Sequence, residues 1–308
     1  MQIQSPVAGT GSRKVYGLLG AAAILWGAQP VVVKGLLIGL SPLVITVYRY
    51  IGITAILFAV MLYNEGRITL PSRRHLAALA AMGISGIAVN NVLQITGLEY
   101  STAVNCSLFS ATTPALTAML AALFLREIPT AVQWGGIAIS FLGTLLLITR
   151  GSPAVITAFA FNLGDVLYFF SQLGWAVYTI LSRKVMVDLS PLATTAWAGL
   201  AGLLATGILA WHSSVDMTPA MTVETVSAIG YMTIGGGVLA MTWWNEGVRI
   251  VGPSRAAVFF NVMPLVGLLL AVLLLGERLG WSEVLGGAWI LGGVYLTTRS
   301  SRKTNDNS

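Results

Sequence analysis

Long apolar runs recur along the whole chain, and they constrain its fold more than any other feature. A helix needs about 20 mostly apolar residues to cross the hydrocarbon core of a bilayer. Only short polar connections separate the runs, which leaves no stretch long enough for a soluble domain. They lie near residues 15–38, 42–63, 75–97, 101–125, 130–149, 162–182, 190–211, 225–247, 254–275 and 281–298. We therefore expect an all-α membrane protein with ten transmembrane helices.

The composition favours lipid as the main environment. Charged residues make up 9% of the chain and hydrophobic residues 56%, whereas soluble domains carry about 25% charged residues. The net charge of +6 comes from basic residues that lie between apolar runs, so we expect a bilayer and no nucleic acid as partner. Cys106 is the only cysteine, and the two histidines fall in separate polar connections. We expect no metal site, no cofactor, no P-loop ATPase activity and no enzymatic activity.

The distribution of lysine and arginine predicts the orientation of the chain. Loops that face the cytoplasm carry an excess of these residues. With ten crossings and the N-terminus inside, 13 of the 17 basic residues face the cytoplasm and 2, Arg150 and Arg278, face outwards. Lys34 and Arg49 fall within or near the ends of spans. We predict a multi-pass protein of the cell inner membrane with both termini cytoplasmic.

The two halves of the chain share landmarks about 150 residues apart. Pro114 precedes Glu127 by 13 residues, and Pro264 precedes Glu277 by the same distance. Repetition at a fixed offset indicates that one structural unit occurs twice. Each unit contains five crossings, an odd number, so the second enters the membrane from the opposite side. Secondary transporters often have this architecture, with the substrate site at the interface of the repeats.

The tryptophans follow the same register. Trp26 precedes Pro42 by 16 residues, as Trp175 precedes Pro191. We predict two inverted five-helix repeats around a central cavity. The expected segments are a cytoplasmic tail at 1–14, a first repeat at 15–149, a connection at 150–161, a second repeat at 162–298 and a cytoplasmic tail at 299–308.

These motifs resemble a known family. The Trp26-Gly27 segment, the stretch 97–103 before Pro114, and the Leu125-Arg126-Glu127 sequence are similar to an EamA-type repeat of the drug/metabolite transporter superfamily. The resemblance covers residues 15–298 and implies a central cavity formed mainly by spans one, three, four, six, eight and nine. It also implies that spans five and ten are peripheral and pair between protomers in some members, which would make a homodimer. Trp244-Asn245-x-Gly247 is similar to the YddG-type amino-acid exporters.

Polar and aromatic side chains follow helical spacings in the same six spans. Inside a membrane such side chains face a cavity or a partner helix. The alternative is that the amides and hydroxyls only join helices, at about 0.6–2 kcal/mol each, and that some tryptophans are interfacial anchors. The candidate substrate-binding residues are Trp26, Gln29, Asn90, Asn91, Gln94, Asn105, Ser110, Tyr168, Gln172, Trp175, Trp244, Asn245 and Asn261.

Pro114 and Pro264 occupy matching places in the two halves, and we expect paired kinks that serve gating. None of the acidic residues falls near the middle of a span, so we expect gradient-driven movement rather than strict proton antiport. Amides, hydroxyls and indoles suit a net-neutral zwitterion. The sequence favours an exporter of amino acids or related metabolites. A multidrug or other metabolite exporter, a membrane enzyme and a scaffold are the alternatives.

The halves also differ in ways that bear on the substrate. Arg49 of span two has no basic counterpart in the second half, because Ala198 occupies the matching position. Such differences are where we expect substrate choice to be determined.

Overall fold

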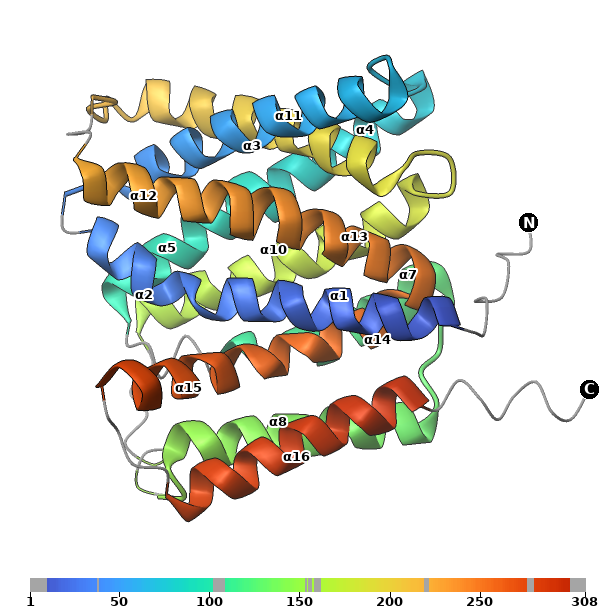
Figure 1. Cartoon of the computed structure of the whole chain (residues 1–308), viewed down its shortest axis with the longest axis vertical. Helices are drawn as coiled ribbons and strands as arrows, with labels where there is room; N and C mark the ends of the chain where they lie inside the picture. The colour runs from blue at the N-terminus through green and yellow to red at the C-terminus, as the bar shows by residue number, and fades with distance from the viewer. Residues whose placement is uncertain are drawn as a thin grey trace, which may run out of the picture.

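The structure is a computed structural model, and it describes residues 10–37, 39–101, 109–152, 162–218, 222–275 and 280–299, with the isolated positions 154 and 157. Within these residues the chain is all-helical, and Figure 1 shows the helices side by side in one bundle. The start of α1 (Thr10–Gly27) and the end of α16 (Trp281–Arg299) lie at the same end of the bundle (Figure 1). Asn105 and Glu277 lie outside the described residues.

The remaining helices follow the predicted spans, and several of them consist of shorter segments joined end to end. The first half contains α2 (Gln29–Leu36), α3 (Pro42–Glu65), α4 (Arg73–Gly83), the π-helical segment η1 (Ile84–Val89), α5 (Asn90–Tyr100), α7 (Thr113–Leu125) and α8 (Ala131–Thr149). The second half contains α10 (Leu163–Val185), α11 (Pro191–His212), α12 (Val223–Tyr231), the π-helical segment η2 (Met232–Leu239), α13 (Ala240–Val251), α14 (Pro253–Ala257), the 3₁₀ segment η3 (Val258–Val262) and α15 (Met263–Leu275). When adjoining segments are counted together, the described residues form the ten helices that the sequence predicts.

Local sequence signals explain where the helices begin. Ser41 caps α3 by accepting a hydrogen bond from the backbone N–H of Val44 at 3.4 Å. Ser190 caps α11 in the same way, with the N–H of Ala193 at 3.1 Å. A proline follows each serine, and proline suits the first helical position because the N–H it lacks would have no partner there.

Four helices are long and apolar enough to cross a membrane, judged by length and composition alone. They are Pro42–Glu65, Arg73–Tyr100, Pro191–His212 and Val223–Val251. Shorter apolar helices cover Lys14–Gly27, Thr113–Leu125, Ala131–Leu147 and Val284–Thr298. The first predicted span is divided because α1 ends just before the Gln29-Pro30 start of α2. The ninth is divided because α14 passes through a 3₁₀ turn into α15.

Close helix contacts recur with the offset of the sequence repeat. Gly86 lies against the side chain of Tyr178, which leaves no room for a Cβ. Gly236, 150 residues after Gly86, lies against the side chain of Gln29, which is 149 residues before Tyr178. The π-helical segments η1 and η2 also occupy matching places. These pairs support a repeat of about 150 residues, while the inverted relation of the halves stays a prediction.

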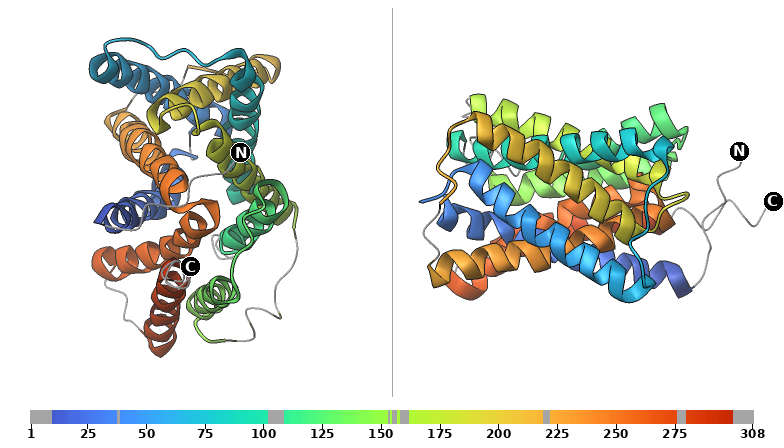
Figure 2. Two further views of the ribbon diagram at one scale, coloured as in Figure 1. Left: turned by 90° about the vertical axis from the view of Figure 1, so that its right-hand side faces the viewer. Right: turned by 90° about the horizontal axis from the view of Figure 1, so that it is seen from above.

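The helices α8 and α16 pack against each other at one side of the bundle (Figures 1 and 2). Their backbones approach closely at glycines, since a Cβ on Gly143 would lie 2.7 Å from the carbonyl oxygen of Gly286. Small residues permit such contacts between membrane helices. Spans five and ten thus pair with each other inside one chain, and their pairing between protomers stays a prediction.

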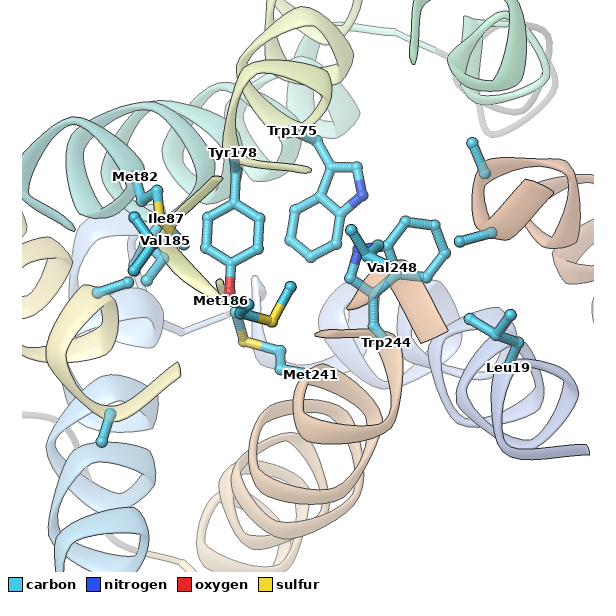
Figure 3. Packing of buried hydrophobic residues seen from close by; sticks show 14 of the residues in the cluster. Leu19, Met82, Ile87, Trp175, Tyr178, Val185, Met186, Met241, Trp244 and Val248 are labelled. Atoms are coloured by element: carbon cyan, nitrogen blue, oxygen red, sulfur yellow. The ribbon is translucent and has the colours of Figure 1, made fainter. Parts of the chain in front are cut away.

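Two apolar clusters of different size fill the bundle. The larger cluster joins α1, α3, α10, α11, α13 and η3, and Figure 3 shows Trp175 and Tyr178 of α10 beside Met241 and Trp244 of α13. The smaller cluster consists of Val33, Leu36, Ile45, Ile95 and Met232. A cavity lies between them, because Val33 and Ile95 of the smaller cluster and Trp175 and Met241 of the larger one all line it.

Candidate substrate cavity

The cavity has a volume of about 120 Å³ and is lined by helices from both halves of the chain. Arg49 is the only charged residue among the described residues of the lining, which otherwise combine amides, aromatic rings and aliphatic side chains. The lining residues are Trp26, Gln29, Val33, Arg49, Tyr50, Asn90, Asn91, Gln94, Ile95, Leu98, Tyr168, Gln172, Trp175, Gly236, Met241, Phe260 and Met263.

Three amides of α5 face the cavity from the first half. Asn90 donates through Nδ2 to the carbonyl oxygen of Ser171 at 2.8 Å, and Gln94 donates through Nε2 to the hydroxyl of Tyr168 at 3.3 Å. Asn91 accepts a hydrogen bond from Nη1 of Arg49 at 3.1 Å through its Oδ1. These bonds join α5 to α10 and to α3, so the amides hold the wall together as well as line it.

The polar stripe of α10 forms the adjoining wall. Tyr168, Gln172 and Trp175 line the cavity at spacings of four and three residues, which places them on one helical face. The Oε1 atom of Gln172 accepts a hydrogen bond from Thr113 at 2.7 Å, and the hydroxyl of Tyr168 lies 3.0 Å from that of Ser110. These contacts fix the stripe against the start of α7.

An aromatic cluster forms the floor of the cavity. We use this name for Trp26, Trp175, Trp244 and Phe260, whose ring centroids lie 5.0–6.0 Å apart. Trp26 and Trp175 meet edge to face at 5.3 Å, and the indole N–H of Trp26 donates to the carbonyl oxygen of Gly236 at 2.8 Å. Edge-to-face pairs of this kind add about 0.5–1.5 kcal/mol each beyond the area they bury.

The bundle differs at its two ends. The cavity lining extends from the centre towards the C-terminal ends of α2 and α5, and we call this the cavity end. The opposite end, where α7, α10 and α13 finish, we call the closed end. There, Leu19 and Val248 are fully buried beyond the aromatic cluster and belong to the larger apolar cluster. The floor of the cavity is therefore backed by a thick apolar layer.

Charged residues from both halves meet at the closed end. Nε of Arg183 lies 3.6 Å from Oε1 of Glu127, and Nη1 of Arg183 donates to the carbonyl oxygens of Val248, at 3.4 Å, and Arg249. Burial raises the pKa of Glu127 above its usual value, while Arg183 and Arg255 oppose that shift. The cluster thus links the segment after α7 to α10 and α13.

A second polar contact at the closed end joins the start of α4 to the segment after α10. The ring Nε2 of His75 lies 3.0 Å from a carboxylate oxygen of Asp188, and Arg74 lies 3.1 Å from the same oxygen. The Nδ1 atom of His75 lies 3.0 Å from the hydroxyl of Ser72. Glu127 and Asp188 thus both join the two halves at the closed end.

Most of the predicted site residues line this cavity, but four described ones do not. Ser110 and Trp244 lie directly behind the lining, in contact with Tyr168 and with the aromatic cluster. Asn245 donates to Tyr178 at 2.7 Å and to Thr195 at 2.8 Å, and is fully buried. Asn261 donates to Ser140 of α8 at 2.7 Å. These last two amides join helices, which is the alternative that the sequence leaves open for such residues.

The two prolines lie where helices restart. Pro114 is the second residue of α7, after a turn at residues 111–112, and Pro264 is the second residue of α15, directly after η3. Proline fits this position because the first N–H groups of a helix lack an intrahelical partner. Both residues thus mark interruptions of the α-helix, and their role in gating stays a proposal.

Arg49 is the main lining residue absent from the candidate set. The sequence does show it as a lone charge in an apolar span without a counterpart at Ala198. Tyr50 and Met241 carry no sequence signal of their own, because aromatic and sulfur side chains are ordinary components of a membrane core.

A model of the EamA-like transporter family matches residues 13–149 and, a second time, residues 162–299. The chain belongs to this family. Membrane transport is therefore the general activity of this EamA-like protein, and the two matched segments coincide with the two halves described above.

Relatives of this EamA-like chain are also named transporters. It is 29% identical over 285 residues to the uncharacterized transporter YyaM of Bacillus subtilis, which covers 92% of this chain and 93% of that protein. It is 26% identical over 291 residues to the uncharacterized inner membrane transporter YedA of Escherichia coli K12, which covers 92% and 90%. One solved crystal structure superposes with a TM-score of 0.74 over 94% of this chain and 98% of that chain, at 18% identity, which shows the fold alone.

Proposed function

We propose that the protein is a secondary transporter that exports amino acids or related small metabolites across the inner membrane by alternating access. The observation that carries the proposal is the cavity at the junction of the two halves, which lies between a small and a large apolar cluster. A transporter needs a ligand-sized site that opens to one side at a time, and bundles with repeats build such sites near the bilayer midplane.

The size of the cavity favours small metabolites over drugs. Pockets for drug-sized ligands have volumes of about 300–1,000 Å³, whereas the volume of this cavity is about 120 Å³. The amides of Asn90 and Gln94 and the hydroxyl of Tyr168 offer polar contacts, and the aromatic floor offers apolar ones. An amino acid with a modest side chain combines both demands. The Trp244-Asn245-x-Gly247 sequence supports the same class.

Interrupted helices supply the means for alternating access. The segments η1 and η2 lie in α4–α5 and α12–α13, and the Pro264 break lies between η3 and α15. Irregular turns of this kind often mark hinges in helices. We propose that these helices bend. The closed end then opens, while residues pack more closely around the smaller apolar cluster and close the cavity end. The excess of basic residues at that end makes it the cytoplasmic side in this proposal.

The lining supports gradient-driven movement. It contains no carboxylate among the described residues. Asp165, buried at the start of α10, does not line the cavity, and its carboxylate accepts hydrogen bonds from Ser101 and from the backbone N–H of Asn162. A proton antiporter places a titratable acid in the path of the substrate, and such an acid is not part of this lining.

Flux in proteoliposomes tests the proposal. We expect counterflow of labelled neutral amino acids into vesicles preloaded with the same unlabelled compound, above the level of protein-free vesicles. The flux should persist when an ionophore dissipates the pH gradient. Flux of dye-like drugs without any amino-acid flux would favour a multidrug exporter, and dependence on a pH gradient would contradict the gradient-driven mechanism. Absence of flux for every compound would contradict transport of this substrate class.

A further inference from the structure

Arg49 is a buried charge without a counter-ion. It lies in the second turn of α3, with 5% of its surface exposed, and lines the cavity. Its Nη1 atom donates to Asn91, and its Cζ atom lies 5.8 Å from the ring centroid of Tyr50. No carboxylate of the described residues lies within ion-pair distance of it. Within the described residues its charge is therefore met by neutral groups alone.

An arrangement of this kind is costly unless something else supplies negative charge. Buried charges in proteins are normally paired, and a charge in a membrane span carries a penalty of about 2.5–3.5 kcal/mol on insertion scales. Nothing in the packing requires an arginine here, because the matching position of the second half holds Ala198, which is fully buried. The charge is thus explained better by a ligand than by the fold.

Unpartnered donors of the lining add to this charge. Nε of Arg49, Nε2 of Gln29 and Nε1 of Trp175 are buried and donate to no acceptor within the described residues. They come from α3, α2 and α10, so three of the helices that line the cavity each carry one unpartnered donor in its wall. A buried donor left without an acceptor costs about 1–3 kcal/mol. The cavity therefore has a surplus of donors that an anionic acceptor would satisfy.

The free edge of the guanidinium suits a carboxylate in particular. Asn91 occupies Nη1, which leaves the Nε side of the fork without a partner. Arginine binds carboxylates through two parallel N–H bonds from such an edge. The lining residues that the structure describes carry no negative charge for an ammonium group and offer neutral acceptors such as the amide oxygens of Asn90 and Gln94.

We propose that Arg49 binds the carboxylate of the substrate, that the carboxylate is the obligatory group, and that the ammonium group of an amino acid is dispensable. This inference rests on the proposed function and extends it, because it makes small 2-hydroxy and 2-oxo acids substrates alongside amino acids. One guanidinium matches one carboxylate, so monocarboxylates are favoured over dicarboxylates.

Matched compounds separate the roles of the two charged groups. The probes are leucine, 2-hydroxy-4-methylpentanoate and leucinamide, together with alanine, lactate and alaninamide. Binding is measured as stabilisation against heat in detergent, and transport as counterflow in proteoliposomes. We expect the amino acid and the hydroxy acid of a series to bind within about threefold of each other, and the amide at least about tenfold more weakly, a difference of about 1.4 kcal/mol.

Variants then locate the effect at Arg49. Arg49→Gln should raise the KM of both acids at least tenfold and bring acid and amide to parity, while Arg49→Lys should retain part of the preference for acids. Arg67→Gln removes the same charge from the exposed segment between α3 and α4, and should leave the preference intact. The comparison of compounds on the unaltered protein needs no variant, so a misfolded Arg49→Gln protein does not prevent the test.

The outcomes distinguish this inference from the proposed function. Binding of amides as tight as that of acids, or no binding of any probe, contradicts the role of Arg49. So does a folded Arg49→Gln protein that keeps the preference for acids. Carboxylate-dependent binding without counterflow of any probe contradicts transport of this class but supports the carboxylate site.

Discussion

The two ends of the bundle contain matching contacts between a glycine and a neighbouring helix, but the side chains at these contacts are polar at one end and apolar at the other. At the cavity end Gly97 lies against Tyr168, and at the closed end Gly247, 150 residues later, lies against Leu19. Leu19 itself precedes Tyr168 by 149 residues, so the two contacts occupy matching places of the repeat. Tyr168 offers a hydroxyl, which is bonded to Gln94, whereas Leu19 offers only hydrocarbon.

The neighbouring positions differ in the same direction. Gln94 lines the cavity, and the residue 150 positions later is Trp244, which is 1% exposed and part of the aromatic cluster. The same backbone arrangement thus carries a polar cavity wall at one end and a buried apolar layer at the other. We call this apolar layer of the closed end, which includes Leu19, Trp244 and Val248, the plug. The chemistry of a few matched side chains, more than the architecture, decides which end is hollow in this conformation.

The largest effect is expected where the plug is made polar. Trp244→Gln places at the closed end the amide that Gln94 supplies at the cavity end, and removes a buried indole. Loss of a buried tryptophan costs about 3–5 kcal/mol. We expect a lower melting temperature and faster thiol labelling of a Val248→Cys reporter in a Cys106→Ser background. A reporter that stays protected, with unchanged melting temperature, would show that the plug does not depend on this side chain.

A smaller effect should separate the two matched glycines. A Cβ on Gly97 would lie 2.9 Å from the carbonyl oxygen of Gly164, a backbone atom, whereas a Cβ on Gly247 would lie closer still to Cδ2 of Leu19, a side-chain atom. Overpacking costs about 1–3 kcal/mol, and least where neighbours can adjust. We therefore expect Gly97→Ala to lower the melting temperature in detergent more than Gly247→Ala does. Equal losses of melting temperature in the two variants would mean that the neighbours of both glycines adjust to the added Cβ equally well.

The smallest effect concerns pH at the closed end. Burial raises the pKa of Glu127 in this conformation, and in the proposed mechanism the carboxylate would regain its usual pKa once this end opened to water. Protons therefore bind the closed form more tightly, so acid favours closure and that stabilisation is lost as pH rises through the raised pKa. Labelling of a Val251→Cys reporter should slow on acidification from about pH 8 to about pH 5.

The control for this prediction is the same reporter in a Glu127→Gln background. Thiol labelling itself slows in acid, because the thiolate is the reactive form. The ratio of the labelling rates of the two proteins removes that dependence. The ratio of the Glu127 protein to the Glu127→Gln protein should fall towards low pH, and a constant ratio would exclude a role for the titration of Glu127.

Much of the fold can be predicted from the sequence because membrane helices have strong sequence signals. Apolar runs locate the spans, and the Trp26 and Trp175 register gives the offset that also relates Gly86 to Gly236. The α10 stripe was predictable because α10 is one uninterrupted helix, so a constant spacing identifies one face.

The sequence could not place every site residue, and the reason is geometric. Asn245 follows η2 and Asn261 lies within η3, and in both segments the helix departs from 3.6 residues per turn. Each such segment turns the following residues by an amount that the spacing of apolar residues does not reveal. Arg49 needed a different kind of evidence, since only its neighbours in space show that it lacks a counter-ion.

The single charge of the cavity has a consequence for the membrane potential. An amino acid is a neutral zwitterion, so the electric field does no work on it during export. A hydroxy acid leaves as an anion, and a potential of 100 mV, negative inside, favours that movement by about 2.3 kcal/mol. A site that recognises only the carboxylate, through Arg49, would thus accept amino acids, whose transport does not depend on the membrane potential, and hydroxy acids, whose export the potential favours.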